Sequence, residues 1–154
     1  MIDVDVQLAS SKEEIPPIEQ LQEWAEIVLK QFHTDAEIVL RIVDIKEISD
    51  LNKAYRHRDG PTNVLSFCFE KPANISIHLL GDVVICAPIV QREALEQSKS
   101  FDSCLAHMVV HGILHLLGFN HVKETEAETM ENEEIKIMRI LGFANPYEQC
   151  IPIQ

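Results

Sequence analysis

Residues 107–121, HMVVHGILHLLGFNH, hold four of the seven histidines of this 154-residue chain. His111 and His115 are four residues apart, so on a helix their imidazoles project from one face, about one turn from each other. Two side chains placed in this way can bind the same metal ion. The segment is therefore the first candidate for chemistry.

A third histidine follows the residue that is expected to end this helix. Gly118 suits the left-handed turn that ends many helices, and a bend at Phe119 and Asn120 would return His121 to the same face. Three neutral imidazoles leave a metal ion with an open position, which is typical of catalytic zinc, and such an ion lowers the pKa of a bound water towards neutrality. We predict one Zn²⁺ per chain, bound by His111, His115 and His121, and hydrolytic chemistry.

Two neighbours of the ligands have a less definite role. His107 lies one further turn back and could be a ligand, but three ligands and a water already complete a tetrahedron, so we favour a place behind the ligands or at the pocket edge. The spacing is similar to that of the metzincin proteases, except that Gly112 stands where the protease has its glutamate base. This argues against peptide hydrolysis. Because glycine weakens a helix, we expect Gly112 to let another segment or a substrate come close.

The elements that must position these histidines follow from the spacing of apolar residues. Period-two alternation or β-branched runs predict strands at residues 2–8, 36–43, 64–70 and 79–86. Helical spacing predicts helices at 18–32, 45–56, about 88–99, about 102–117 and about 124–141. Strands that alternate with helices, followed by helices alone, predict an α/β or α+β fold, a small mixed four-stranded sheet covered by about five helices. The single metal site is expected on the helix that carries His111 and His115.

Length and composition restrict the class of protein. A chain of 154 residues fits one domain, residues 1–154. No apolar stretch is long enough to cross a membrane, and the N-terminus lacks the basic start and apolar run of a signal peptide. We predict a cytoplasmic protein with no membrane partner. The cysteines are widely separated and are interpreted as free thiols, packed as small hydrophobes: Cys68, Cys86, Cys104 and Cys150.

The distribution of charge limits where a nucleic acid could bind. The formal net charge is −12, which opposes binding to phosphates. Acidic residues gather in 124–134, which we interpret as a solvated helix face. The basic residues of the segment 53–58 lie together, so an RNA site would have to use this local patch.

Three segments together closely resemble the bacterial YbeY family: YRHRDGPTNVLSF (55–67), LGDVVI (80–85) and HGILHLLGFNH (111–121). The resemblance extends from the first strand to the final helix. It implies a cytoplasmic, zinc-dependent, single-strand-specific endoribonuclease that acts in 3′-end maturation of small-subunit ribosomal RNA and in ribosome quality control. It also implies contacts with the ribosome, ribosomal proteins and an assembly GTPase.

The resemblance also assigns residues by position. It implies that His111, His115 and His121 are the metal ligands and that Arg56 is the family's functional arginine. One departure is the pair Phe119-Asn120, because members often have tyrosine and aspartate there.

Chemistry gives Arg56 a role that agrees with this assignment. Its planar guanidinium could hold a phosphate and stabilise the charge of the transition state, although a solvated arginine at a loop end is the alternative interpretation. Arg58 is a weaker candidate for the same role. Asp82 lies inside an apolar strand and should be paired or functional, with a structural hydrogen bond favoured. Three polar residues in and just after the turn that follows Arg58 are weak candidates for phosphate contacts: Thr62, Asn63 and Ser66.

The predicted reaction is attack on an RNA phosphodiester held by Arg56. Either water or a ribose hydroxyl could be the nucleophile. Two alternatives remain open, a metal-dependent hydrolase of a peptide or small ester, and a non-catalytic ribosome-assembly module in which the metal pins the last two helices together.

Overall fold

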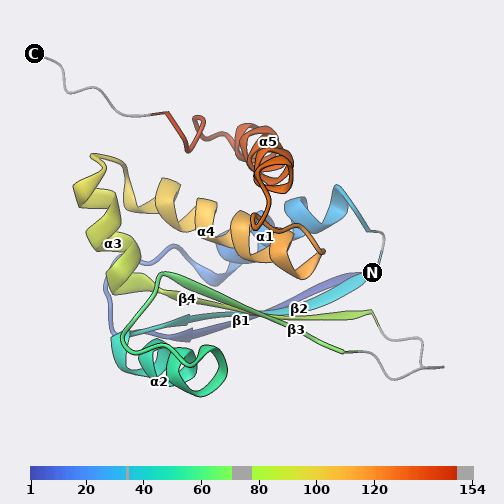
Figure 1. The fold of residues 1–154 in the computed structure, drawn as a ribbon. Helices are drawn as coiled ribbons and strands as arrows, with labels where there is room; N and C mark the ends of the chain where they lie inside the picture. Colours follow the sequence, from blue (N-terminus) through green and yellow to red (C-terminus); the bar gives the residue numbers. More distant parts are fainter. Residues whose placement is uncertain (34, 71–77, 149–154) are drawn as a thin grey trace, which may run out of the picture.

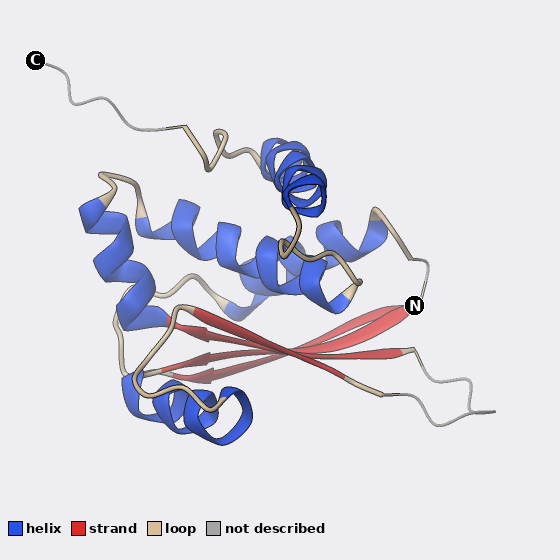
Figure 2. Cartoon of the chain, viewed as in Figure 1, coloured by secondary structure: helices blue, strands red, loops and turns tan. Residues whose placement is uncertain are grey.

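One mixed sheet forms the centre of the molecule. The computed structural model describes residues 1–33, 35–70 and 78–148. Within them the strands are β1 (Ile2–Ala9), β2 (Ala36–Val43), β3 (Val64–Cys68) and β4 (Leu79–Cys86). They lie in the order β1-β2-β4-β3 (Figures 1 and 2). β1, β2 and β4 are parallel, whereas β3 is an antiparallel edge strand. The predicted mixed four-stranded sheet is confirmed.

The helices lie on both faces of this sheet. They are α1 (Ile18–Lys30), α2 (Ile45–Arg56), α3 (Ala87–Glu96), α4 (Phe101–Leu116) and α5 (Glu124–Leu141). Figure 1 shows α1 and α4 over one face, α2 beneath the other, and α5 packed on the far side of α4. The α+β class and the five predicted helices are confirmed for the described residues. As a result, the histidine-bearing helix α4 lies between the sheet and α5.

Strand β2 shows why the two faces differ. Ile38, Leu40 and Ile42 alternate along it and are at most 2% exposed, because they pack into the core shared with α1 and α4. Val39 and Arg41 point the other way and are only partly buried. A smaller apolar cluster fills the space under α2: Val43, Ile48, Leu65, Val84, Cys86 and Ile89. Each Å² of buried apolar area contributes roughly 25 cal/mol to stability. The apolar cluster between α4 and the sheet is larger than the one under α2, so it stabilises the packing of α4 more strongly.

Three predicted elements extended too far along the chain. The helix predicted at 18–32 ends at Lys30. The strand predicted at 64–70 ends at Cys68, and beyond it the ladder continues only through the bond from Phe69 N to Leu80 O, at 2.9 Å. Apolar and aromatic residues favour a strand, but they do not reveal where pairing stops. The helix predicted to reach Lys99 ends at Glu96, because Ser98 has a positive φ of 54° that interrupts helical geometry.

Among the described residues, no helix has both the length and the apolar character needed to cross a membrane.

Candidate metal centre

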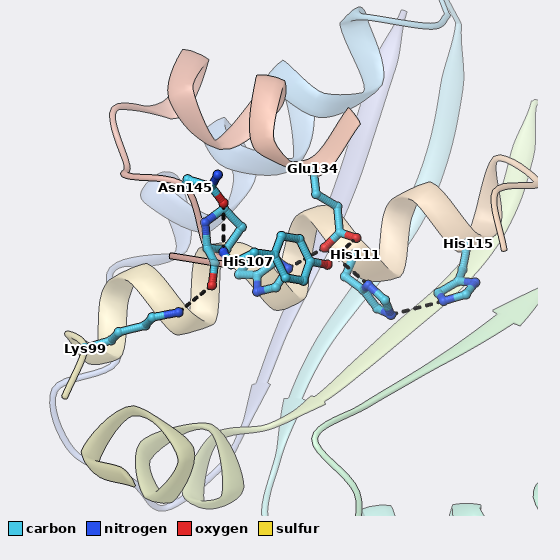
Figure 3. A network of polar contacts seen from close by, with 8 residues as sticks. Lys99, His107, His111, His115, Glu134 and Asn145 are labelled. Carbon is cyan, nitrogen blue, oxygen red and sulfur yellow. Dashed lines mark hydrogen bonds and ion pairs between the residues drawn. The ribbon is translucent and has the colours of Figure 1, made fainter. Parts of the chain in front are cut away.

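Helix α4 presents its histidines on the side that is left free by its apolar stripe. The hydroxyl of Ser100 caps the helix by accepting the N–H of Ser103, at 3.1 Å. Its apolar side chains are buried against the sheet and α1. His107, His111 and His115 repeat every four residues and lie in a row along the partly buried side (Figure 3). The spacing predicted from sequence is the spacing observed.

A tight turn after α4 brings the third histidine back. Gly118 has a φ of 100°, a left-handed conformation, and its N–H donates to His115 O at 3.1 Å. The N–H of Phe119 donates to Leu114 O at 3.0 Å, which completes a Schellman turn. The ring centroid of His121 then lies 5.7 Å from that of His111 and 5.1 Å from that of His115. The structure therefore brings together the three histidines that the sequence selected.

The donor atoms of these three histidines suit a transition-metal ion. Their ligand nitrogens all lie within 4.8 Å of one another. The Nε2 atoms of His111 and His115 are 3.1 Å apart, close to the roughly 3.4 Å expected for two nitrogens that bind a tetrahedral ion at about 2.0–2.1 Å. Imidazole nitrogen is a preferred ligand of Zn²⁺ and of several competing ions. The residues present thus fit the predicted ion.

Burial keeps His115 in the form that binds metal. Desolvation, with the nearby His111 and His121 as smaller causes, lowers the pKa of His115 to about 4. Its imidazole is therefore neutral at neutral pH. A neutral imidazole has the lone pair that a metal ligand needs.

Gly112 allows α4 to approach the sheet closely. A Cβ on this residue would lie 2.5 Å from Val83 Cγ1 and 3.3 Å from Ser66 Oγ. The Ser66 hydroxyl donates to Gly112 O at 2.9 Å. The expected close approach is therefore made by β3 and β4. It also occupies the hydroxyl of Ser66, one of the weak candidates for phosphate contacts.

A cleft of about 810 Å³ opens in front of the histidines. His111, His115 and His121 line it together with Arg56, the last residue of α2, and Arg58 of the loop that follows. The guanidinium of Arg56 donates through Nη2 to Ser66 O at 2.6 Å and lies 5.5 Å from the Phe67 ring centroid. The structure brings Arg56 and the histidines, far apart in sequence, to one cleft.

The loop between α2 and β3 contributes further polar residues to the cleft. Thr62 and Asn63 line the cleft beside Arg58, and the amide of Asn63 contacts Glu93 at 3.5 Å. Asn52 fixes this loop by donating from its buried amide to Gly60 O at 3.0 Å. The loop that carries Arg58 is thereby anchored to α2.

The residues that the structure describes include no partner for Asp82. Asp82 is exposed and lies opposite Phe67 of β3 and Val39 of β2, on the part of the sheet that α2 leaves uncovered. No hydrogen bond or ion pair to its carboxylate occurs among the residues that the structure describes, although partial desolvation raises its pKa. The structural hydrogen bond that the sequence favoured is therefore not made to any described residue, because the sequence does not show which face of the strand a helix covers.

Comparisons with known proteins agree with this arrangement. A family model described as Endoribonuclease YbeY matches residues 5–142. The chain is 52% identical over 152 residues to a protein named Endoribonuclease YbeY from Methylococcus capsulatus (strain ATCC 33009 / NCIMB 11132 / Bath), covering 99% of both chains. This chain belongs to the YbeY family. Its fold is also similar to the solution structure of TM1509 from Thermotoga maritima, with a TM-score of 0.60 and 26% identity over 97% of this chain and 99% of that one.

In this YbeY-family chain the pair before the last histidine, Phe119-Asn120, makes local contacts. Phe119 packs edge-on against Phe32 of the α1 end, with 5.6 Å between ring centroids. Asn120 is exposed, and its side-chain oxygen accepts the N–H of Val122 at 3.4 Å. The amide therefore serves the local turn.

Sequence reasoning missed one residue of this YbeY-family site. Glu134 was included in a solvated acidic face, but it is 1% exposed and its carboxylate faces α4 (Figure 3). Oε2 accepts from His107 Nε2 and lies 3.4 Å from His111 Nδ1, while Oε1 accepts from the Tyr147 hydroxyl at 2.8 Å. A signal existed, because Glu134 occupies a stripe position between Met130 and Met138.

These contacts keep Glu134 ionised and hold His107 in a hydrogen bond. Burial alone would raise the pKa of Glu134, but the hydrogen bonds and charges of His107 and His111 outweigh it and lower the pKa to about 2. Desolvation and the bond to Glu134 raise the pKa of Tyr147. His107 therefore lies beside His111 in the row and is bonded to Glu134.

None of the described cysteines of this YbeY-family chain belongs to a group of side chains that could hold a metal ion. Cys86 is buried and Cys68 is exposed, and both are free thiols, as predicted. Cys68 lines the cleft, so the expectation that it is a buried hydrophobe was wrong. Cys104 is half-buried, and Cys150 lies outside the described residues.

Proposed function

We propose that this protein is a zinc-dependent endoribonuclease that cleaves single-stranded RNA. The observation that carries the proposal is the convergence of His111, His115 and His121 at a cleft that Arg56 also lines. The YbeY family to which the chain belongs supports RNA as the substrate. We further propose one Zn²⁺ per chain, held by these histidines.

A bound zinc ion would supply Lewis acidity for a phosphodiester oxygen and would make a nucleophile available near neutral pH. The protein's own contribution begins with Arg56. Its guanidinium already has one fixed bond, to Ser66 O, which holds the fork at the cleft while other N–H groups remain for a phosphate. Charge that develops on the phosphate during attack is stabilised by such a preorganised cation. Arg58 adds positive charge on the same side.

The shape of the cleft favours an unpaired strand. His111 and His115 are partly buried beneath the cleft, so the scissile phosphate has to enter it. A single strand can bend its backbone and splay its bases, whereas the phosphates of a duplex stay on the outside of a stiff rod. Arg56 and Arg58 give this cleft a local positive charge in a chain of net charge −12. Binding should therefore weaken as salt increases.

The biological assignment follows from the resemblance of the sequence. We propose a cytoplasmic role in 3′-end maturation of small-subunit ribosomal RNA and in ribosome quality control. The partners proposed with it are the ribosome, ribosomal proteins and an assembly GTPase. The chain is proposed to act as one domain, residues 1–154.

The test is cleavage of a labelled single-stranded RNA by the zinc-loaded protein, with a duplex of the same sequence and a chelator-treated sample beside it. We expect cleavage of the single strand alone, and none after chelation. Arg56→Ala should reduce cleavage by roughly 10²–10³-fold, the usual effect of removing one group that stabilises transition-state charge, with zinc content unchanged. Arg139→Ala, an exposed arginine of α5, is the matched control.

Several results would contradict the proposal. Retained cleavage by Arg56→Ala would remove the role assigned to Arg56. Cleavage of casein or peptides without cleavage of RNA would favour a hydrolase of another substrate, and zinc binding without any cleavage would favour an assembly module. An RNA with 2′-O-methyl groups separates the two nucleophiles, because an unchanged rate excludes attack by the ribose hydroxyl.

A further inference from the structure

Glu134 occupies a position where an acid is costly. It lies in the buried stripe of α5 with Met130, Ile137 and Met138, and its side chain is 1% exposed. A carboxylate removed from water is destabilising by several kcal/mol unless partners compensate it. Ordinary packing of α5 on α4 would be served as well by an apolar residue. The position of this acid therefore needs a reason beyond packing.

Glu134 has three hydrogen-bonding partners, and two of them are histidines of the α4 row. His107 Nε2 bonds Oε2, His111 Nδ1 lies 3.4 Å from the same oxygen, and the Tyr147 hydroxyl donates to Oε1 at 2.8 Å. A carboxylate with such neighbours accepts from each of them, so the hydrogen of the His111 imidazole is placed on Nδ1. The lone pair is then on Nε2, the atom 3.1 Å from His115 Nε2.

The C-terminal segment holds this carboxylate from behind. Tyr147 is fixed by its backbone N–H, which donates to Asn145 Oδ1 at 2.8 Å, and by its ring, which packs edge-on against His107 with 5.5 Å between centroids. Lys99 donates through Nζ to Pro146 O (Figure 3). The segment after α5 is therefore tied to the start of α4 at two points.

We infer that Glu134, anchored by Tyr147, is a positioning residue that fixes the orientation and tautomer of His111 so that Nε2 faces the metal. The inference rests on the metal site of the proposed function and adds the groups that prepare it. A ligand imidazole whose second nitrogen is bound to a carboxylate binds a metal ion more strongly, and loss of such a partner typically lowers affinity by 10–100-fold.

The same atoms allow one competing arrangement. His107, His111 and Glu134 offer donor atoms within 4.8 Å of one another and could hold an ion of their own. In the structure these atoms already bond to each other, which satisfies the buried carboxylate without an ion. Metal stoichiometry separates the two arrangements.

The experiment compares Glu134→Gln with Glu133→Gln in the full chain. Glutamine keeps the volume but replaces one acceptor oxygen by a donor amide, so it cannot accept from all three partners. Glu133, a partly buried neighbour on α5, loses the same charge without a bond to His111. Zinc affinity is measured by competition with a chromogenic chelator, zinc content by elemental analysis, and fold by the Tm in excess chelator.

We expect Glu134→Gln to bind one zinc ion 10–100-fold more weakly than the wild type while it remains folded in excess chelator at the assay temperature, with Glu133→Gln close to wild type. The visible spectrum of the Co²⁺-substituted protein should change in Glu134→Gln, a readout that a purely structural role would not move. Should Glu134→Gln fail to fold, Tyr147→Phe carries the test. It removes one hydrogen bond at a half-exposed residue, and we expect a loss of about fivefold in affinity, the value of one typical hydrogen bond.

Equal zinc affinity in the wild type and Glu134→Gln would overturn the inference, as would two zinc ions in the wild type of which Glu134→Gln loses one. A wild type that binds no zinc would overturn the metal site of the proposed function as well. Zinc binding that depends on Glu134 in a protein that cleaves no RNA would contradict the proposed reaction alone and support the positioning role.

Discussion

The two halves of the histidine row on α4 have different surroundings although their spacing is identical. His107 and His111 face α5, where the carboxylate of Glu134 meets both rings. His115 and the Nε2 side of His111 face the cleft that Arg56 also lines. The residue type and the four-residue repeat are the same in both halves. What differs is the neighbouring element, which makes one half a closed hydrogen-bonded network and the other an open cluster of ligand atoms.

The covered half of the histidine row fixes the imidazole rings, and the open half leaves their ligand nitrogens accessible. The covered half is closed by Glu134 at 1% exposure, and it fixes the rings from behind. The open half keeps the nitrogens accessible to an ion and a substrate, because these histidines line the cleft together with residues of the loop after α2. A site of this kind combines fixed ligands with a free coordination position, as catalytic metal centres require.

The largest effect is expected in the open half. His115→Ala should lower zinc affinity by well over about a hundredfold, because even loss of a group behind a ligand costs 10–100-fold. RNA cleavage should be lost with it. The measurements are chelator competition and the cleavage assay, and His33→Ala, an exposed histidine elsewhere, is the control. Unfolding of His115→Ala in conditions where the chelated wild type stays folded would instead indicate a structural role.

An intermediate effect is expected where α4 meets the sheet, between the two halves. Gly112→Ala places a Cβ 2.5 Å from Val83 Cγ1, so α4 or Val83 must shift. Overpacking of this kind typically lowers the free energy of unfolding by about 1–3 kcal/mol. Urea unfolding measures it.

Val83→Ala removes the methyl groups that cause this clash. In the double variant the two losses should therefore be less than additive. Strict additivity would show that the added Cβ does not meet Val83.

The smallest effect concerns the pH dependence of the chelated protein. Folding lowers the pKa of His115 from 6.5 to about 4, so between these values the unfolded state binds more protons and stability decreases as the pH falls. Glu134, whose pKa falls from 4.5 to about 2, adds a further loss only below pH 4.5. Urea unfolding of metal-free protein at pH 7, 6 and 5 should show a decline that is smaller in His115→Asn. Equal declines would contradict the burial assigned to His115.

Much of the fold could be read from the sequence because its signals are local. Alternation in β2 and the apolar stripe of α1 report directly which side of each element is buried, and both predictions are confirmed. The predicted ends were less accurate, as β3 shows, because pairing stops where the partner strand leaves and not where the composition changes.

Some residues of the candidate site could likewise be predicted from local sequence, whereas others depend on tertiary packing. Chain-local geometry brings His111 and His115 one turn apart, and the left-handed turn at Gly118 returns His121. Arg56 was selected for its chemistry and by resemblance, but its nearness to the histidines depends on β3 lying beside α4. Glu134 was misread because it follows a run of acidic and polar residues in the sequence, whereas its neighbours in space are imidazoles and a tyrosine.

The sequence by itself determined which imidazoles can converge, because a helix and a glycine turn fix distances over a few residues. Only the tertiary structure decided which nitrogen of His111 is hydrogen-bonded, which acid is buried, and that Asp82 stays in solvent. These outcomes depend on desolvation by elements far away in the chain. No local pattern records them, because burial is a property of the packed molecule.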